Sequence, residues 1–386
     1  MLEVKFSGIK RMELLAQQTP GVLSLSQGSL KVGGIPTDIK THTQSLLNSD
    51  KTDYYVSTYG ITPLREKIAE VLSLQHNVNI SMDQILVSHG SSSAVAALML
   101  MLLNADDEVL LPEPTYPAYA NLARVSKANP KFVSCFLKES TSFGEVKWEF
   151  DVEKFKSAVT PKTKMVVIAN PCNPTGIILP EKVVKELVNF CESRGIYLLI
   201  DEVYDDFIFE NEPFYSVTPF VADHSFIIRT GSFSKNFALS GWRVGYMVVP
   251  KHLLNAACAI QDSLLVCASS IAQYAALYAM NHPELTKPMQ EIVYNNLLYA
   301  NAVLKPLVDK GLVAYQSPKS AYYIFLKTKE EETTNLCLDI LQKAKVTVVP
   351  GSVFGPTGSP FIRICYAREP HILREAMDRF VNYFGI

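Results

Sequence analysis

An amide side chain follows one of the apolar runs in the middle of the chain. Residues 164–169 are apolar at their centre and lead into Asn-Pro-Cys-Asn-Pro-Thr-Gly at residues 170–176. Two X-Pro units prevent this segment from being helical, so Asn173 offers an amide at a restricted position. The alternative interpretation is an ordinary turn, because Asn, Pro and Gly are typical turn residues.

An acidic side chain closes the next apolar run. Residues 196–200 lead directly into Asp201, Glu202, Val203 and Tyr204. A carboxylate at the end of a buried strand is unfavourable unless it has a partner, and a cationic heterocycle would be one. The alternative is that Asp201 caps a following helix.

A lysine follows a third apolar run, at residues 225–229. Residues 231–245 read Gly-Ser-Phe-Ser-Lys-Asn-Phe-Ala-Leu-Ser-Gly-Trp-Arg-Val-Gly. Small, hydroxyl and apolar neighbours could lower the pKa of Lys235 and favour a free amine that forms a Schiff base. Ser232, Ser234 and Arg243 are suited to an anionic phosphate. A solvated surface lysine is the alternative.

A fourth segment of small and hydroxyl residues lies between an apolar run and the start of a predicted helix. Ser-His-Gly-Ser-Ser-Ser at residues 88–93 lies between an apolar run at 85–88 and a helix expected from Ser91. Free backbone amides at a helix N-terminus bind phosphate well, although a serine-rich N-cap is an equal alternative. The chain has no G-x-x-x-x-G-K-[ST] and no G-x-G-x-x-G, which argues against a P-loop or a dinucleotide fingerprint.

The elements that must position these residues alternate along the chain. Strands are expected at residues 85–88, 108–111 (ending at Pro112), 164–169, 196–200, 225–229 and 244–249. An amphipathic helix is expected at residues 181–194, with Gly195 as its C-terminal cap. Apolar strands separated by helices indicate an α/β fold with a mostly parallel central sheet covered on both faces. Ligands bind at the carboxyl ends of such strands.

The C-terminal hundred residues have a different pattern. Strands are expected at residues 321–326, 346–348 and 361–366, with helices near 331–344 and 370–384. This indicates a smaller α+β domain, which the N-terminal segment could join. Two X-Pro pairs interrupt a helical stretch near residues 281–290. We therefore expect a large domain at residues 46–284 and a small domain made of residues 1–45 and 285–386.

Composition narrows the function classes. At ~150 residues per domain, 386 residues suggest two or three domains. A composition of 48% apolar and 19% charged residues is typical of a globular protein. A formal net charge of −2 provides no electrostatic footprint for nucleic acid or an anionic membrane. The longest apolar run, residues 94–103, is about half of the ~20 residues that a spanning helix needs.

Localisation is expected to be cytoplasmic. Residues 1–10 carry charges but no apolar signal core. The seven cysteines are odd in number and include no C-x-x-C pair, which indicates reduced thiols. No metal site is expected.

In this order and spacing, N-P-x-N-P-T-G, D-E-x-Y and S-x-S-K-x-x-x-x-x-G-W-R-x-G resemble one family. They are similar to the motifs of fold-type I, pyridoxal-phosphate-dependent aminotransferases of class I/II (aspartate aminotransferase-like). The resemblance runs from about Leu23 to the C-terminus. It implies that residues 46–284 bind pyridoxal 5'-phosphate. It also implies ping-pong transfer of an amino group from an amino acid to a 2-oxo acid through a Schiff base on Lys235.

The resemblance also implies roles for single residues around the cofactor ring. Lys235 would carry the cofactor and move protons, and Asp201 would keep the pyridine nitrogen protonated. Asn173 and Tyr204 would hydrogen-bond the phenolic oxygen. Tyr116 would stack on the ring, with ordinary core packing as the alternative. The residues that would hold the phosphate are Gly90, Ser91, Ser92, Ser232 and Arg243, together with Tyr55 of a neighbouring subunit.

The substrate would be gripped from another part of the chain. Arg363 would bind the α-carboxylate, for which its planar fork is suited, and Gly28 and Asn173 would lie beside the same group. A surface arginine is the alternative. Because Tyr55 would reach a neighbouring active site, a homodimer with shared sites is expected, without nucleic-acid or membrane partners.

The amino donor stays open, because the loop after Gly28 departs from the family pattern. Ser29-Leu30-Lys31 replaces an acidic step, Ser92 stands where some relatives have lysine, and Ser320 replaces a common glycine. Candidates for side-chain recognition are Lys31, Tyr59, Tyr119 and Arg124. Lys31 could pair with a dicarboxylate or simply be solvated.

Two competing hypotheses accompany the aminotransferase. A carbon–sulfur β-lyase or another α,β-eliminating enzyme would use the same cofactor for a different reaction. A ligand-binding regulatory module would use the fold without catalysis, although the chain shows no helix-turn-helix extension and no basic patch.

Overall fold

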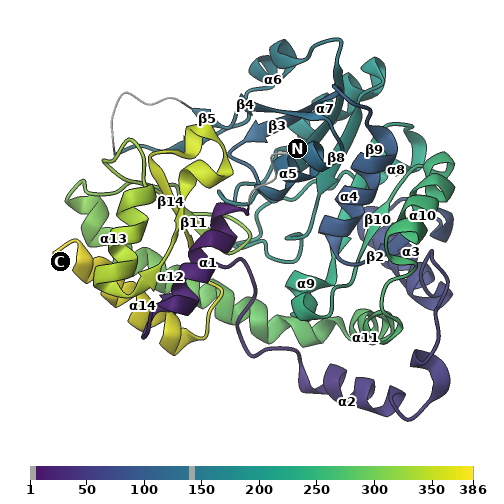
Figure 1. The fold of residues 1–386 in the computed structure, drawn as a ribbon, viewed down its shortest axis with the longest axis horizontal. Coiled ribbons are helices and arrows are strands. Elements are labelled where there is room, and N and C mark those ends of the chain that lie inside the picture. The colour runs from purple at the N-terminus through teal and green to yellow at the C-terminus, as the bar shows by residue number, and fades with distance from the viewer. Residues whose placement is uncertain (1–5, 139–143, 386) are drawn as a thin grey trace.

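The protein is built around a seven-stranded sheet and a three-stranded sheet (Figure 1). It is described here by a computed structural model over residues 6–138 and 144–385. The larger sheet has the order β2 (Ile85–Ser88), β10 (Gly245–Val248), β9 (Ile227–Ser232), β8 (Tyr197–Asp201), β7 (Thr163–Ala169), β3 (Glu108–Glu113) and β4 (Asn129–Ser134). Strand β10 is antiparallel to both neighbours, and the other pairs are parallel. The mostly parallel sheet expected from the sequence is confirmed.

Helices cover both faces of this sheet. One face packs against α4 (Ser91–Leu102), α5 (Ala118–Val125) and α10 (Lys251–Leu265), and the other against α3 (Thr62–His76), α6 (Val152–Ala158), α7 (Glu181–Arg194) and α11 (Ser270–Asn281). Successive strand residues point to opposite faces, so Met165 and Val167 join one hydrophobic cluster and Val166 and Ile168 the other. Burial on both faces explains why these strands are apolar throughout.

Two strands extend beyond the predicted limits. Strand β3 continues through Pro112 to Glu113. It pairs with β7 only as far as Leu110, and beyond that point β4 is its single neighbour, which tolerates a residue without an N–H group. Strand β9 begins at Ile227 and continues to Ser232, because its last residues pair with β10.

The predicted helix over residues 181–194 is confirmed as α7. Its buried residues are Val184, Leu187, Val188 and Cys191. Gly195 caps its end with a positive φ of 64°, a conformation that glycine adopts without steric cost.

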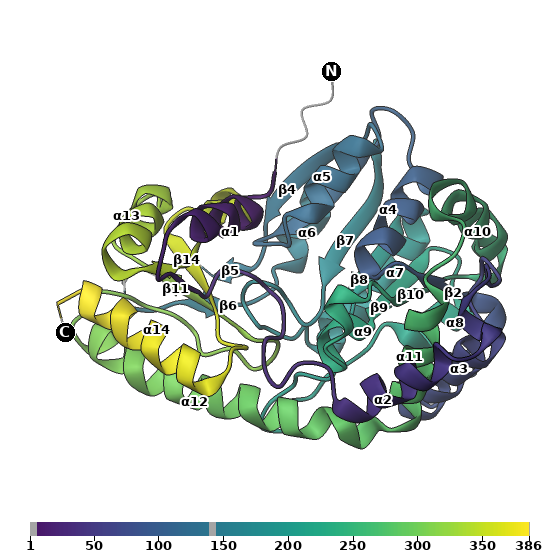
Figure 2. The same ribbon diagram turned by 60° about the horizontal axis from the view of Figure 1, so that its bottom comes forward.

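The C-terminal part of the chain forms the three-stranded antiparallel sheet. Its order is β11 (Tyr323–Lys327), β14 (Phe361–Cys365) and β13 (Val349–Pro350). Helices α12 (Lys287–Asp309), α13 (Thr334–Ala344) and α14 (Pro370–Tyr383) pack with it, and Figure 2 shows α12 lying along α14. The single strand predicted at 346–348 is two strands, because β12 (Val346–Thr347) and β13 pair with different partners.

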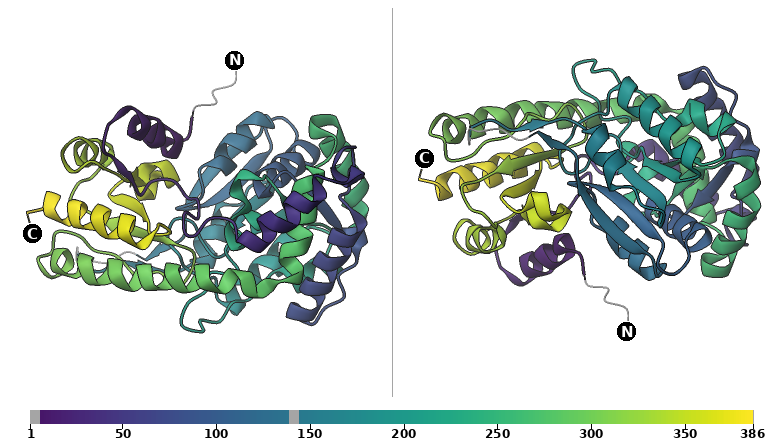
Figure 3. Two further views of the ribbon diagram at one scale, coloured as in Figure 1. Left: turned by 90° about the horizontal axis from the view of Figure 1, so that it is seen from below. Right: turned by 90° about the horizontal axis from the view of Figure 1, so that it is seen from above.

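The N-terminal segment joins this smaller part, as the sequence suggested. Strand β1 (Leu23–Ser24) pairs in parallel with β12, and α1 (Gly8–Gln18) lies beside it. Figure 3 shows α12 running along both parts of the molecule. The domain limits at residues 45/46 and 284/285 stay a prediction.

The remaining elements are short. In the described part of the chain they are α2 (Thr37–Leu46), α8 (Thr218–Asp223), α9 (Phe233–Asn236), the pair β5 (Leu137–Lys138) and β6 (Lys147–Trp148), and six 3-10 turns. Within residues 6–138 and 144–385, no helix combines the length and apolarity that a bilayer span requires. All seven cysteines are free thiols.

Candidate active site

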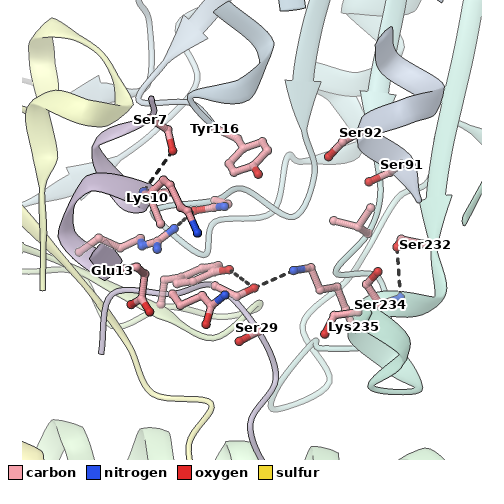
Figure 4. A pocket seen from close by; sticks show the side chains of 18 of the residues that line it. Ser7, Lys10, Glu13, Ser29, Ser91, Ser92, Tyr116, Ser232, Ser234 and Lys235 are labelled. Carbon is pink, nitrogen blue, oxygen red and sulfur yellow. Dashed lines mark hydrogen bonds between the residues drawn. The ribbon is translucent and has the colours of Figure 1, made fainter. Parts of the chain in front are cut away.

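A cavity of about 760 Å³ lies at the carboxyl ends of β7, β8 and β9, where the strand-end argument predicts a ligand (Figure 4). The predicted residues that line it are Gly28, Ser91, Ser92, Tyr116, Asn173, Asp201, Tyr204, Ser232, Lys235, Arg243 and Arg363. Figure 4 shows Ser91, Ser92, Ser232 and Lys235 on one side, with Ser7, Lys10 and Glu13 of α1 on the other.

Lys235 points into this cavity from the short helix α9. Ser232 caps that helix by accepting a hydrogen bond from the amide of Ser234, which holds the lysine just beyond β9. The ammonium Nζ of Lys235 donates to the carbonyl of Gly28 over 2.7 Å. Burial lowers the pKa of Lys235 to about 8, so its amine is neutral far more often than that of a solvated lysine.

Asp201 is the last residue of β8, and its carboxylate is buried. Tyr119 donates a hydrogen bond to Oδ2 over 2.6 Å, and Thr230 donates to Oδ1 over 2.8 Å. Burial raises the pKa of Asp201, while the two hydrogen bonds act in the opposite direction. The helix-cap alternative is wrong, because the residues after Asp201 form turns.

The segment at residues 170–176 is a turn, but a buried one. The amide of Gly176 donates to the carbonyl of Cys172, which closes the turn and leaves Asn173 at the cavity. Asn173 Oδ1 accepts a hydrogen bond from Arg363 Nη1 over 3.1 Å. The hydroxyl of Tyr204 is 2.7 Å from that of Tyr323.

Arg363 is fully buried on β14, so the surface alternative is wrong. Its Nη2 donates to the carbonyl of Ser26, and its guanidinium lies 4.4 Å from the ring centroid of Tyr323. Its Nε has no hydrogen-bond partner within the described part of the chain. A buried guanidinium with an unused donor at a cavity is a suitable partner for a carboxylate.

The turn between β2 and α4 forms an anion cradle. Gly90 is the N-cap of α4 with φ of 83°, and no side chain caps the helix, so the serine-cap alternative is wrong. A Cβ atom on Gly90 would lie 2.8 Å from Arg243 Nη2. A Cβ on Gly245 would lie equally close to the backbone of Gly90. Uncapped amides, serine hydroxyls and a guanidinium are the donors that a phosphate requires.

Pyridoxal phosphate therefore fits the residues present. The uncapped turn and Arg243 match its phosphate, and the buried Asp201 matches a cationic ring nitrogen. Tyr116 lines the cavity and makes an edge contact with Tyr119, with ring centroids 5.5 Å apart.

Other candidates lie elsewhere. Tyr55 is 83% exposed and does not line the cavity. Among the candidates for side-chain recognition, Lys31 lines the cavity, but Tyr59 and Arg124 do not. The hydroxyl of Tyr119 is already bonded to Asp201, which makes this tyrosine a partner of the acid rather than a selector of substrates.

Sequence reasoning missed residues that only long-range packing brings to the site. Thr230 pairs with Asp201 in the register of β8 and β9. The available signal in the sequence was that Thr230 directly precedes the motif that begins at Gly231. Helix α1 contributes Ser7, Lys10 and Glu13 to the cavity wall. An amphipathic N-terminal helix could be recognised from the sequence, but not its place at the cavity.

Comparisons with known proteins agree with this geometry. The protein-family model for aminotransferase class I and II matches residues 20–380. An aspartate aminotransferase from Pyrococcus abyssi is 32% identical over 376 residues, covering 97% of this chain and 94% of that protein. An aromatic-amino-acid aminotransferase from Thermococcus litoralis is 30% identical over 379 residues, with shares of 97% and 94%.

Solved structures show the same fold. The crystal structure of an aspartate aminotransferase from Thermotoga maritima has a TM-score of 0.89 at 27% identity and covers 100% of this chain and 98% of that one. These findings confirm the α/β fold and the dependence on pyridoxal phosphate, and they favour amino-group transfer over elimination. The chain belongs to the aminotransferase class I and II family and is a pyridoxal-phosphate-dependent aminotransferase.

Proposed function

We propose that Lys235, Asp201 and Arg363 are the central residues of amino-group transfer between an amino acid and a 2-oxo acid. The observation that carries this proposal is the buried amine of Lys235, whose pKa is about 8, in one cavity with a buried carboxylate and a buried guanidinium. An amine with this pKa can both accept and return a proton near neutral pH.

Lys235 has two tasks in this proposal. When bound, pyridoxal phosphate supplies a carbonyl carbon that bonds to amines and a ring that takes up the electron pair left by the α-proton. Lys235 would hold the cofactor through its Nζ before the amine of the substrate takes that place. Its neutral Nζ would then be able to accept the proton of the α-carbon, and the ammonium group so formed would be able to give that proton back.

Asp201 supports that chemistry through its charge. A buried carboxylate is stabilised by a cation beside it, so it favours a protonated ring nitrogen. Tyr119 and Thr230 each occupy one carboxylate oxygen, which fixes the plane of the group. Asn173 and Tyr204 are assigned to the phenolic oxygen of the ring, and Tyr116 to its face.

Arg363 orients the substrate by its α-carboxylate. Ser26 and Asn173 each accept one of its hydrogen bonds, so the guanidinium is held before the substrate arrives. Gly28 lies beside the same site. Gly90, Ser91, Ser92, Ser232 and Arg243 are assigned to the phosphate of the cofactor.

We also propose a homodimer in which Tyr55 reaches the phosphate of the other subunit. Tyr54 and Tyr55 are 74% and 83% exposed, and Leu264, Leu265 and Val266 at the end of α10 are exposed as well. Hydrogen bonds from Gln261 to Thr58 and from Thr58 to Asp262 hold the two segments together. So many exposed apolar side chains in one region are typical of an interaction surface.

Mixing two inactive variants tests the shared site. Tyr55→Ala and Lys235→Ala homodimers should each be weak or inactive, and a re-equilibrated mixture should regain about 25% of wild-type activity, because half of the dimers contain one intact site. A mixture no more active than its parts would contradict shared sites. Sedimentation velocity measures the oligomeric state independently.

The limits of the two domains and the compartment complete the proposal. Residues 46–284 would form the cofactor-binding domain, with residues 1–45 and 285–386 as the small domain. Location in the cytoplasm is supported by seven free thiols.

The experiment that tests the catalytic proposal is a half-reaction. Purified protein loaded with cofactor is mixed with single amino acids without a 2-oxo acid, and the visible absorbance and the 2-oxo acid are measured. We expect one 2-oxo acid per site for the wild type and none for Lys235→Ala. Ammonia accumulating with continued turnover would instead identify an eliminating enzyme.

A further inference from the structure

The cavity contains more positive charge than the proposed function uses. Five cationic and two acidic side chains line it, namely Lys10, Lys31, Lys235, Arg243, Arg363, Glu13 and Asp201. The proposal assigns Arg243 to the phosphate, Arg363 to the α-carboxylate and Lys235 to the chemistry. Asp201 is paired with the ring nitrogen. Lys10, Lys31 and Glu13 therefore remain without a role.

Glu13 does not neutralise either of the two remaining lysines. Its Oε1 accepts hydrogen bonds from the hydroxyls of Ser24 and Ser26, which join α1 to the end of β1 and the segment that follows it. Neither Lys10 nor Lys31 forms an ion pair with any residue of the ranges 6–138 and 144–385. Two unpaired ammonium groups therefore face one cavity.

Both lysines are attached to backbone that is held in place. Ser7 caps α1 by accepting from the amide of Lys10, so this residue lies in the first turn of the helix. The amide of Lys31 donates to the carbonyl of Ala367 over 3.0 Å. Arg368 also donates to the carbonyls of Gln27 and Ser29, which fixes the loop that carries Lys31.

The cavity lining on the side of the two lysines includes polar residues beside the apolar Ile9, Ala16 and Val22. The polar residues Gln17, Gln27 and Ser29 line the same cavity. Ser29 Oγ is buried without a hydrogen-bond partner within the described residues. Figure 4 shows Lys10 on the opposite side of the cavity from Lys235. A dicarboxylic substrate held by Arg363 and Lys235 would share one cavity with these donors.

We propose that Lys10 and Lys31 bind the second carboxylate of a dicarboxylic substrate, so that this aminotransferase prefers acidic amino acids and their 2-oxo acids. The inference rests on the proposed function, in which Arg363 takes the α-carboxylate. Two cations that line one cavity attract a carboxylate more strongly than either alone, and the interaction weakens as salt is added.

The test compares acidic and neutral substrates in matched variants. We would measure kcat/KM in the half-reaction for L-aspartate, L-glutamate, L-2-aminobutyrate and O-phospho-L-serine. The variants are Lys10→Met, Lys31→Met and the double variant, which keep side-chain length and remove charge. Arg11→Met is the control, because Arg11 carries the same charge on the same helix but does not line the cavity.

We expect the double variant to lose about tenfold in kcat/KM for the acidic amino acids, and each single variant about threefold. L-2-Aminobutyrate should change by less than about twofold, as should every substrate with Arg11→Met. Binding of glutarate, measured by calorimetry, should weaken in parallel, whereas binding of butyrate should not.

Three outcomes would overturn the inference. One is an equal loss for acidic and neutral substrates, a second is no loss at all, and a third is a wild-type preference for O-phospho-L-serine. Each leaves the proposed function intact as long as some amino acid is converted. Failure of every amino acid to yield a 2-oxo acid in the wild type would instead contradict the proposed function itself.

Discussion

The two sides of the cavity are built in different ways. On the side of the large sheet, Asp201 ends a buried strand, and Asn173 and Lys235 each follow one within a few residues. On the other side, α1, the loop at residues 24–31 and Arg363 of β14 come from opposite ends of the chain. Arg363 and Ser26, which share a hydrogen bond, are 337 positions apart.

This difference separates two tasks of the cavity: the strand-end side holds the residues proposed for the chemical step, and the other side holds those proposed to bind the substrate. The strand-end side is rigid because its residues are carried by paired strands with buried faces. The other side depends on hydrogen bonds between segments, such as Glu13 with Ser26. Changes on the first side should affect every substrate, as should changes at Arg363, whose proposed partner is the α-carboxylate that all amino acids share. Changes in α1 and in the loop at residues 24–31 should affect substrates unequally.

The largest effect should come from the acid on the strand-end side. Asp201→Asn removes the charge that we assign to the ring nitrogen of the cofactor but keeps the shape of the side chain. We expect kcat to fall by about 10²- to 10⁴-fold for all amino acids, which single-turnover kinetics would measure. A fall in kcat for only one class of amino acid would contradict the view that the strand-end side affects all substrates alike.

The next effect concerns the anchor of the α-carboxylate. Arg363→Lys keeps the charge but loses the planar fork that contacts Ser26 and Asn173. We expect kcat/KM to fall by about 10- to 100-fold, mainly through KM. Steady-state kinetics with an acidic and a neutral amino acid would measure this. A drop in kcat alone would mean that Arg363 acts on the chemical step.

The pKa of Lys235 predicts a pH dependence for the chain before the cofactor is attached. With a pKa of about 8, roughly one-tenth of the amine is neutral at pH 7 and about nine-tenths at pH 9. The rate of covalent cofactor attachment to cofactor-free protein should therefore rise about tenfold per pH unit below pH 8 and level off above it. A stopped-flow absorbance series would test this, and a rise that continues past pH 10 would contradict the lowered pKa.

A smaller effect on kcat is expected at Tyr119, which is distant from Asp201 in the sequence but donates a hydrogen bond to it. Tyr119→Phe removes the hydrogen bond to Asp201 Oδ2, which helps to hold the pKa of that carboxylate down. The pKa of Asp201 should rise, and kcat should fall by about threefold to tenfold. The fall should be equal for acidic and neutral substrates. A change in substrate preference would return Tyr119 to the role of a selector.

The smallest effect is expected at the junction of α1 with the segment after β1. Glu13→Gln keeps the shape but removes the charge from two hydrogen bonds with Ser24 and Ser26. We expect a loss of about 0.5–1.5 kcal/mol in the free energy of unfolding, measured by denaturant titration. Glu66→Gln, on the exposed side of α3, is the matched control and should change it little. Equal losses would show that the junction does not stabilise the fold.

Much of the strand-end side could be predicted from sequence. The motifs at residues 170–176, 201–204 and 231–245 are local, and a polar residue directly after an apolar strand must lie at the edge of the sheet. The limits of β3 and β9 were less certain, because they depend on which strand lies beside them. The sequence predicted one strand at residues 346–348 instead of β12 and β13, because these two strands are distinguished only by their different neighbours.

The sequence by itself determined the fold class, because the spacing of apolar residues encodes strands and helices. The resemblance of its motifs to a known family named the cofactor and made Lys235, Asp201, Asn173 and Arg363 candidates. Only the tertiary structure decided that β10 is antiparallel, that Tyr119 and Thr230 hold Asp201, and that α1 brings Lys10 to the cavity. These contacts join segments far apart in the chain. No local pattern specifies them, because they follow from how buried faces pack together once the whole chain has folded.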